Sequence, residues 1–220
     1  MSPRVPVSRR ERPAKPALSR EGIVATAVAV MRAEGLEKVT MRRLAKELDT
    51  GPASLYVYVA GMAELHAAVL DELLGEVDLD PAGETWRDRL AGVLASCTGV
   101  LFQHPALARA AISVRPAGEN YLALVEKLLA LLKEGGADDR QAAWGVDLLL
   151  QLTTASAAEH STRDQAGRTE AEWSQVTRAL QTADARTHPH IHALAGELIS
   201  GSPQARFDWF VDVLTAGILH

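Results

Sequence analysis

The sequence of 220 residues contains one cysteine, few aromatic residues and no long apolar run. Because Cys97 has no second cysteine to pair with, an intrachain disulfide is excluded, and we expect a reducing, cytoplasmic location. The apolar runs are too short to cross a bilayer as a helix, and the first residues do not follow the pattern of a secretory signal. We therefore expect no association with a membrane.

Sequence patterns of catalysis and metal binding are missing as well. We find no glycine-rich phosphate loop, no G-x-S-x-G nucleophile elbow and no paired carboxylates arranged for acid–base catalysis. His188, His190 and His192 lie close together, but Pro189 favours a turn over residues 187–191, and no cysteine or acidic partner stands at zinc spacing. We expect no catalytic site, no metal and no cofactor.

The residues that are abundant favour helices. Hydrophobic residues make up 47% of the chain, with alanine and leucine dominant, whereas aromatic residues reach only 5%. Alanine and leucine have high helix propensities, so an all-α fold is predicted. The chain is long enough for one or two domains and a sizeable hydrophobic core.

Positive charge is concentrated near the amino terminus, although the formal net charge of the whole chain is −5. Residues 1–62 hold 11 of the 23 Lys and Arg residues but only 6 of the 28 Asp and Glu residues. Residues 1–18 carry four prolines and five basic residues, which predicts a disordered basic arm. Such an arm either contacts DNA or serves only as a solubilising tail.

Residues 40–59, TMRRLAKELDTGPASLYVYV, predict two short helices joined by a tight turn. Thr40 stands as an N-cap before the first helix, within which apolar residues recur at helical spacing. Asp49 and Gly51 tolerate the left-handed backbone of a sharp turn, and Pro52 suits the first turn of the second helix. In such a helix-turn-helix, the second helix lies in the major groove of DNA.

The motif lies in a longer stretch that resembles the DNA-binding domain of the TetR family of bacterial transcriptional regulators. This resemblance implies a three-helix DNA-binding domain with a fourth, linking helix over residues 19–77, followed by a boundary at 78–83. A compact three-helix bundle without a DNA-binding role is the alternative. The resemblance is carried by Gly35-Leu36, Val39-Thr40-Met41-Arg42, Leu44-Ala45, Ser54-Leu55-Tyr56 and Ala63-Glu64-Leu65.

The resemblance also implies which residues contact DNA. Arg42 and Arg43 begin the first motif helix, where one can pair with guanine and the other with a phosphate. The second motif helix offers small side chains to thymine methyl groups and tyrosine hydroxyls to phosphates. For Tyr58, burial in the core is the alternative to a contact with DNA. The expected DNA-binding residues are Arg42, Arg43, Lys46, Pro52, Ala53, Ser54, Tyr56, Val57 and Tyr58.

Residues 78–220 are expected to form a larger helical domain. Apolar periodicity predicts helices over residues 84–103, 105–113, 119–134, 138–161, 169–183, 192–199 and 203–218, with a loose polar segment at 161–168. The long helix over 138–161 is apolar on several faces, and the last helix carries an apolar stripe. These faces form either the core of a monomer or an interface with a second copy of the chain.

This second region resembles the C-terminal domain of tetracycline repressor, a scaffold that dimerises and encloses a small effector. Trp86, Arg115-Pro116, Tyr121 and Leu124-x-Glu126 carry the resemblance. It implies a homodimer through the long helix and the last helix, as a palindromic operator requires. The expected interface residues are Leu148, Leu152, Phe207, Phe210 and Leu214.

An effector pocket is implied by the same resemblance. Small and apolar residues replace polar ones at the matching positions, so we expect a hydrophobic effector. For each residue, ordinary helix packing is the alternative, and for Arg115 a surface salt bridge. The expected lining residues are Trp86, Val93, Cys97, Leu101, His104, Ala111, Arg115, Lys127 and Trp144.

Three positions depart from the pattern of these relatives. Asp49 stands in place of a glycine in the motif turn, and aspartate tolerates that backbone shape. Met62 replaces a lysine that grips a phosphate, which is expected to weaken DNA binding. Ala111 replaces the histidine that holds drug-bound magnesium, so neither magnesium nor tetracycline is expected here.

The sequence thus predicts a homodimeric, ligand-responsive transcriptional regulator, most simply a repressor that its effector releases from a palindromic, double-stranded operator. Activation in place of repression fits the same sequence. The alternative is a small-molecule carrier or an enzyme that uses the helical cavity and keeps a vestigial DNA-binding head. Segregated positive charge argues against a vestigial head, because only a head that contacts DNA requires it.

Overall fold

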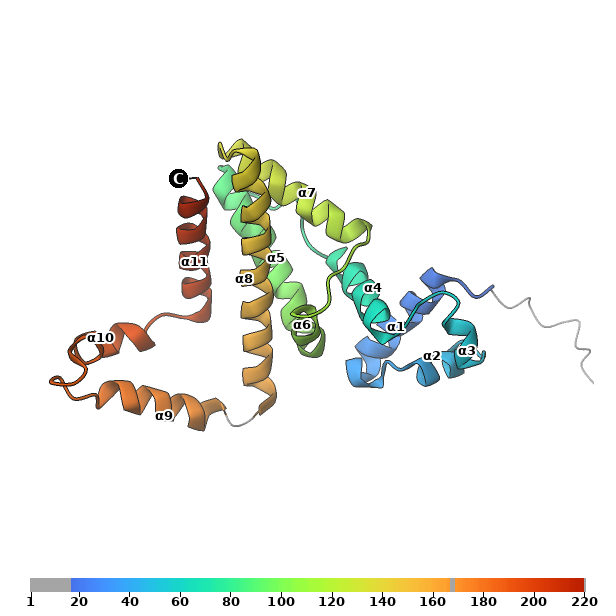
Figure 1. Cartoon of the computed structure of the whole chain (residues 1–220), viewed down its shortest axis with the longest axis horizontal. Helices are drawn as coiled ribbons and strands as arrows, with labels where there is room; N and C mark the ends of the chain where they lie inside the picture. The colour runs from blue at the N-terminus through green and yellow to red at the C-terminus, as the bar shows by residue number, and fades with distance from the viewer. Residues whose placement is uncertain (1–16, 167–168, 220) are drawn as a thin grey trace, which may run out of the picture.

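The computed structural model describes residues 17–166 and 169–219, and every regular element within these ranges is helical (Figure 1). The predicted all-α fold is therefore confirmed. Most of the expected basic arm, residues 1–16, lies outside the described residues. Leu18, at the end of that arm, rests against the hydrophobic core.

Side-chain caps define the first helices of the amino-terminal head. The hydroxyl of Ser19 accepts the backbone N–H of Gly22 at 3.0 Å, and Thr40 caps its helix in the same way. The first helix ends at Gly35, whose φ of 93° is easily reached only by glycine. The head comprises α1 (Arg20–Glu34), η2 (Leu36–Lys38), α2 (Met41–Glu47), α3 (Pro52–Leu55) and α4 (Met62–Leu74).

The rest of the chain forms a helical body around a leucine-rich core. Buried leucines between Leu90 and Leu149 pack against one another and against the end of α4. The longest helix runs alongside the last one, and the two helices between them reach away from the body (Figure 1). The body comprises α5 (Trp86–Gln103), α6 (Pro105–Ala111), α7 (Glu119–Glu134), α8 (Asp139–Ala166), α9 (Thr169–Gln181), α10 (Pro189–Ile199) and α11 (Pro203–Ile218).

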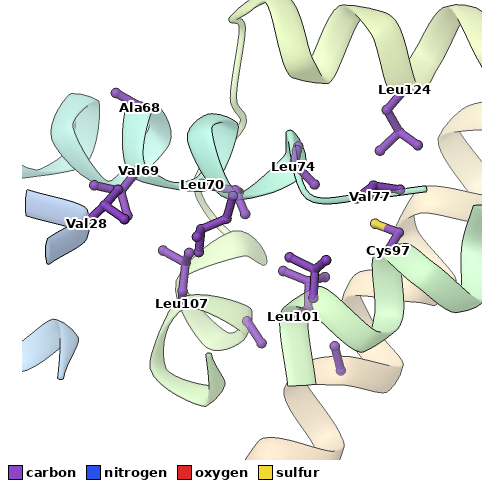
Figure 2. Packing of buried hydrophobic residues seen from close by; sticks show 14 of the residues in the cluster. Val28, Ala68, Val69, Leu70, Leu74, Val77, Cys97, Leu101, Leu107 and Leu124 are labelled. Carbon is purple, nitrogen blue, oxygen red and sulfur yellow. The ribbon is translucent and has the colours of Figure 1, made fainter. Parts of the chain in front are cut away.

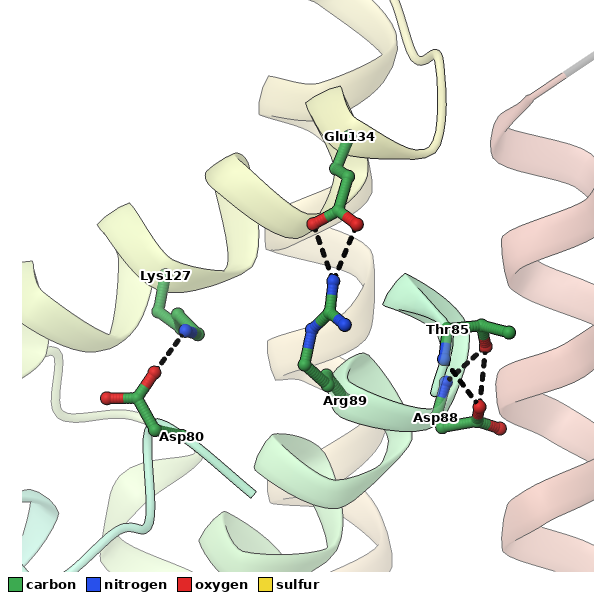
Figure 3. A network of polar contacts seen from close by, with 6 residues as sticks. All are labelled: Asp80, Thr85, Asp88, Arg89, Lys127 and Glu134. Atoms are coloured by element: carbon green, nitrogen blue, oxygen red, sulfur yellow. Dashed lines mark hydrogen bonds and ion pairs between the residues drawn. The ribbon is translucent and has the colours of Figure 1, made fainter. Parts of the chain in front are cut away.

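Polar contacts fix the start of α5 and its position against α7 (Figure 3). Thr85 and Asp88 form a capping box, in which each side chain accepts the backbone N–H of the other residue. Arg89 donates to both carboxylate oxygens of Glu134 at the end of α7, at 2.5 and 2.7 Å. These contacts hold the start of α5 against the end of α7.

The helix boundaries differ from the prediction by three residues or more in four places. α3 is a single turn that ends at Leu55, and the backbone continues as a turn through residues 56–58. α4 ends at Leu74 rather than at residue 77. α8 continues to Ala166, because no glycine or proline interrupts residues 161–166, so the segment predicted to be loose is helical up to that point. α10 begins at Pro189, where the prediction placed a turn, because proline also suits a first helical turn.

Candidate DNA-binding surface and ligand cavity

The turn between α2 and α3 has the geometry that a helix-turn-helix requires. Asp49 adopts a φ of 48°, the left-handed conformation expected of it in place of glycine. The N–H of Thr50 donates to the carbonyl of Ala45 at 2.8 Å and closes the turn over the end of α2. Ala45 and Leu55 are both buried, so α2 and α3 cross in close contact.

The expected DNA-binding residues form an exposed surface on and around α3, with one exception. Val59 turns inward beside Leu55, whereas Tyr58 is 37% exposed and therefore lies at the surface and not in the core. Exposed tyrosines and small residues beside basic ones can contact phosphates and base edges in a groove. The exposed residues are Arg42, Lys46, Pro52, Ala53, Ser54, Tyr56, Val57 and Tyr58.

Arg43 is the exception, because two carboxylates hold its guanidinium within the head. It donates to Glu34 of α1 at 2.6 Å and also to Glu47, one turn further along α2. The hydrogen bond to Glu34, and then that to Glu47, raises the pKa of Arg43. Arg43 therefore joins α1 to α2, and the exposed Arg42 is the better candidate for pairing with guanine.

Glu64 anchors the recognition segment, residues 52–59, to the rest of the head. Its carboxylate accepts the N–H of Ala60 at 2.6 Å, and this hydrogen bond lowers the pKa of Glu64. The same carboxylate pairs with Arg20 of α1 at 3.4 Å. The end of the recognition segment is thus tied to both α1 and α4.

A cavity of about 400 Å³ lies where α4, α5, α6, α7 and α8 meet, and its volume suits a small organic ligand. Cys97 and Leu101 line it from α5, and Ala111 lines it from the end of α6. The turn that follows contributes Arg115. The structure therefore brings four of the predicted pocket residues together at one cavity.

Trp86, Val93 and His104 do not line this cavity. The ring of Trp86 packs on Gly135 at the end of α7, so closely that a Cβ there would lie 2.6 Å from it. Val93 is fully buried in the core, one turn before Cys97 on α5. His104 joins α5 to α6, and burial lowers the pKa of its half-buried imidazole.

Lys127 and Trp144 also lie elsewhere. Lys127 of α7 pairs with Asp80, in the segment before α5 (Figure 3). Trp144 is on an outer face of α8, 70% exposed, with the guanidinium of Arg140 5.2 Å from its ring centroid. Positions matched along the sequence thus did not predict which face of each helix meets the cavity.

Lining residues on α4, α7 and α8 were missed by the sequence analysis. Leu70 and Leu74, one turn apart on α4, face the side where Leu101 of α5 and Leu107 of α6 lie (Figure 2). Tyr121 of α7, with Gln151 and Thr154 of α8, adds polar groups to the lining. The four-residue spacing of these two leucines places them on one face of a helix, but nothing in it indicates a cavity.

The thiol of Cys97 is held in its neutral form. The side chain is almost completely buried, and this burial raises its pKa from 9.0 to about 12. A protonated thiol is a weak nucleophile and a poor metal ligand. Within the described part of the chain, no group of three or more His, Cys, Asp or Glu side chains is placed to hold a metal ion.

A hydrogen bond joins α4 to α7 beside the cavity. Asp71, between Leu70 and Leu74 on α4, accepts the backbone N–H of Tyr121 at 2.9 Å. Its carboxylate lies against Gly118, the N-cap of α7, where an added Cβ would come within 2.1 Å of it. α4 and the first turn of α7 therefore form one unit, which we call the α4–α7 joint.

Apolar side chains remain exposed on the outer faces of α8 and α11. Trp144 and Leu148 protrude from α8, while Trp209, Phe210 and Val213 protrude from α11. Large exposed apolar residues on neighbouring helices are typical of an interface with another chain.

The predicted interface residues are divided between this surface and the core. Leu148 and Phe210 are exposed, and Leu152 and Leu214 are half-buried. Phe207 is buried within its own chain, because its side of α11 faces the body.

Within residues 17–166 and 169–219, no single helix is both long and apolar enough to cross a bilayer. The bent pair α5 and α6, at 117° to each other, reaches that length and composition only jointly.

Two family models match the chain. Residues 23–69 match the model described as bacterial regulatory proteins, tetR family. Residues 80–220 match the model described as tetracyclin repressor-like, C-terminal domain. The first match covers the helix-turn-helix and most of α4, and the second covers the body with its cavity.

Individual proteins are similar over nearly the whole chain. An HTH-type transcriptional regulator of Saccharopolyspora erythraea is 33% identical over 211 residues, which are 93% of this chain and 86% of the relative. The candidate transcription regulator SCO7704 of Streptomyces coelicolor is 60% identical with a TM-score of 0.80, over 94% of this chain and 96% of its own. ActR of the same species, solved in complex with actinorhodin, is 36% identical with a TM-score of 0.80, over 93% and 96%.

Proposed function

Because the chain belongs to the TetR family of DNA-binding transcriptional regulators, we propose that it is a repressor which a small, mainly hydrophobic effector releases from its operator. The exposed surface around α3 reads the operator, and the cavity of the body binds the effector. The observation that carries this proposal is the position of α4, which belongs to the head at one end and lines the cavity at the other.

Two heads are needed for specific binding, since a single short recognition segment reads few base pairs. A homodimer formed through the exposed faces of α8 and α11 presents two heads related by a two-fold axis. Such a dimer fits a palindromic operator whose half-sites are about 34–36 Å apart, one turn of DNA. The separation of the heads then determines the affinity for the operator.

α4 connects the cavity to the head, so a displacement at one end of this helix is transmitted to the other. Val69 packs beside Val28 of α1, while the next residue, Leu70, turns toward the cavity and lies beside Leu107 of α6 (Figure 2). A ligand that displaces Leu70 or Leu74 must therefore move the helix on which the head rests. If it binds this displaced conformation better, it shifts the population away from the form that binds DNA.

The effector assigned to this cavity is apolar over most of its surface. Leucines from α4 and α5 and the neutral Cys97 form the deep part of the lining. The complex of ActR with actinorhodin supports a ligand-responsive role, since that protein has a similar fold and is solved with a small molecule bound. We infer that the effector of this chain is small enough to fit a cavity of about 400 Å³.

A gel-shift titration with the DNA that flanks the coding region tests this proposal. Wild-type protein is expected to form a discrete complex that survives competitor DNA and weakens steeply as salt is raised. Arg42→Ala protein serves as the matched control and should lose the discrete complex while keeping its fold. Only diffuse binding, lost on addition of competitor and equal for both proteins, would contradict a role for this surface in reading that DNA.

A further inference from the structure

Charge is distributed unevenly around the cavity. Among the described residues that line it, Arg115 is the charged one, and no carboxylate takes part in the lining. Gln151 and Thr154 of α8 add groups that can form hydrogen bonds. A bound cation would face the guanidinium without a compensating anion from the lining, whereas an anionic group on the ligand could pair with it.

The polar groups and the apolar groups occupy different depths. The side chain of Arg115 is 71% exposed, and Gln151 is also exposed, so both lie at the mouth of the cavity. Cys97, Leu101 and Leu124 are almost completely buried and form its floor. The cavity thus has an apolar floor and a polar, cationic mouth.

The partner of Arg115 in the free protein is easily replaced. Its guanidinium lies 3.6 Å from the carboxylate of Asp147, whose side chain is 56% exposed. An exposed pair at this distance contributes little, because water screens both charges. Asp147 also accepts a hydrogen bond from Gln151 and keeps that partner when the arginine turns away.

We propose that the effector is an amphipathic anion, with an apolar body on the floor of the cavity and an acidic group that replaces Asp147 as the partner of Arg115. This inference rests on the proposed ligand-responsive function and names the chemical class of its ligand. A carboxylate or sulfonate suits the planar, multiply donating guanidinium. Asp147 then competes with the ligand for Arg115, so its removal favours ligand binding.

Two fluorescent probes with the same aromatic rings test the proposal. Anilinonaphthalene sulfonate carries an anionic group, and phenylnaphthylamine lacks it. Both are titrated into the purified full-length protein without DNA, so the result does not depend on whether the head binds an operator. Arg115→Gln is expected to weaken sulfonate binding about fivefold, Asp147→Asn to strengthen it, and both to leave the neutral probe unchanged.

Two controls assign these effects to the cavity. Arg186 forms a comparable exposed pair with Asp184 at 3.5 Å, away from the lining, so Arg186→Gln should not change either affinity. Ala111→Phe fills the cavity and should displace both probes while retaining the helical circular dichroism spectrum. The proposal is overturned if Arg115→Gln weakens both probes equally or neither, or if a folded Ala111→Phe protein still binds the sulfonate like the wild type.

Discussion

The carboxylate of Asp71 on α4 accepts the backbone N–H of Tyr121 on α7 at 2.9 Å, across 50 residues of sequence. Tyr121 lines the ligand cavity, and Asp71 lies on the helix that carries the head. A ligand that displaces the first turn of α7 therefore also displaces α4, through this hydrogen bond. This contact fixes the direction of the linking helix more firmly than apolar packing alone, because a hydrogen bond depends on angle as well as distance.

Loss of the α4–α7 joint is predicted to weaken operator binding. Asp71→Ala removes the hydrogen bond to Tyr121, which contributes about 1 kcal/mol, and leaves the direction of α4 less restricted. We expect a fall in operator affinity of about fivefold, measured by gel shift. Hydrogen exchange at the Tyr121 amide should accelerate in the same variant.

Two further variants separate the joint from a general effect of charge. Glu72→Ala removes an exposed carboxylate from the next position of α4 and should leave both measurements unchanged. Gly118→Ala keeps Asp71 but places a Cβ within 2.1 Å of its carboxylate, so it should reproduce the effect of Asp71→Ala. Equal operator affinity for Asp71→Ala and wild type would show that the joint has no part in positioning the head.

Arg42 and Arg43 are predicted to act differently when each is replaced by alanine. Arg42 is exposed, so Arg42→Ala should lower operator affinity about tenfold to hundredfold while the melting temperature stays unchanged. Arg43→Ala breaks the contact with Glu34 that joins α1 to α2 and the contact with Glu47 within α2, so it should lower the melting temperature as well. Tyr56→Ala, at an exposed position, should behave like Arg42→Ala.

Scanning calorimetry and gel shifts on the three variants check these expectations together. If Arg42→Ala unfolds the head, or if Arg43→Ala leaves its stability intact, the assignment of one arginine to DNA and the other to the fold is wrong.

The sequence was sufficient to predict features that depend on neighbouring residues. Thr40 is a cap in the structure as predicted, because an N-cap needs only a hydroxyl and the next three residues, and Ser19 caps α1 in the same way. Asp49 takes the left-handed backbone for a similarly local reason. The helix over residues 119–134 was predicted with its final boundaries, since a glycine stands at each end.

Features that depend on tertiary packing could not be predicted in this way. Trp144 was assigned to the pocket through the resemblance, as a neighbour by helical face of the matching positions, and neither resemblance nor periodicity indicates which face of α8 turns inward. Arg43 was assigned to DNA because the sequence does not show that Glu34, on another helix, lies beside its guanidinium. Leu70 and Leu74 line the cavity only because the ends of α5 and α6 meet α4 there.

Cys97 is predicted to resist alkylation in the folded protein. Its pKa of about 12, against an ordinary 9.0, leaves about a thousandfold less thiolate at neutral pH, and burial limits access further. Iodoacetamide should therefore modify the native protein very slowly and the denatured protein rapidly, as followed by mass spectrometry. Cys97→Ser gives the background, and rapid labelling of native protein would show that the cavity floor is open to water.

The exposed faces of α8 and α11 are predicted to hold two copies of the chain together. Leu148→Glu places a charge in the expected interface and should weaken dimerisation about tenfold or more, since the buried carboxylate has no partner. Light scattering after gel filtration measures the mass at decreasing concentration. Leu122 of α7 is also exposed but lies elsewhere, so Leu122→Glu should leave the dimer intact; equal masses for both variants would contradict this interface.

Acidification is predicted to destabilise the protein as the pH falls below about 6.5, through two partly buried histidines. Burial lowers the pKa of His66 and of His104 from the ordinary value of 6.5. A histidine with a lowered pKa in the folded state binds its proton more readily in the unfolded chain, so the free energy of unfolding rises with pH through this window and is lost on acidification. The Nε2 atom of His66 is buried without a hydrogen-bond partner, so protonation there gains no compensating contact.

Melting temperatures measured between pH 5 and 8 check the direction of this effect. The hydrogen bond from the N–H of Ala60 lowers the pKa of Glu64 from its ordinary value of 4.5, so Glu64 stays ionised between pH 5 and 8. A change in melting temperature over this range therefore reports on the histidines and not on Glu64. The double variant His66→Leu, His104→Gln cannot take up the two protons and should show a flatter profile than the wild type. A double variant with the same loss of stability on acidification would assign the effect to other groups.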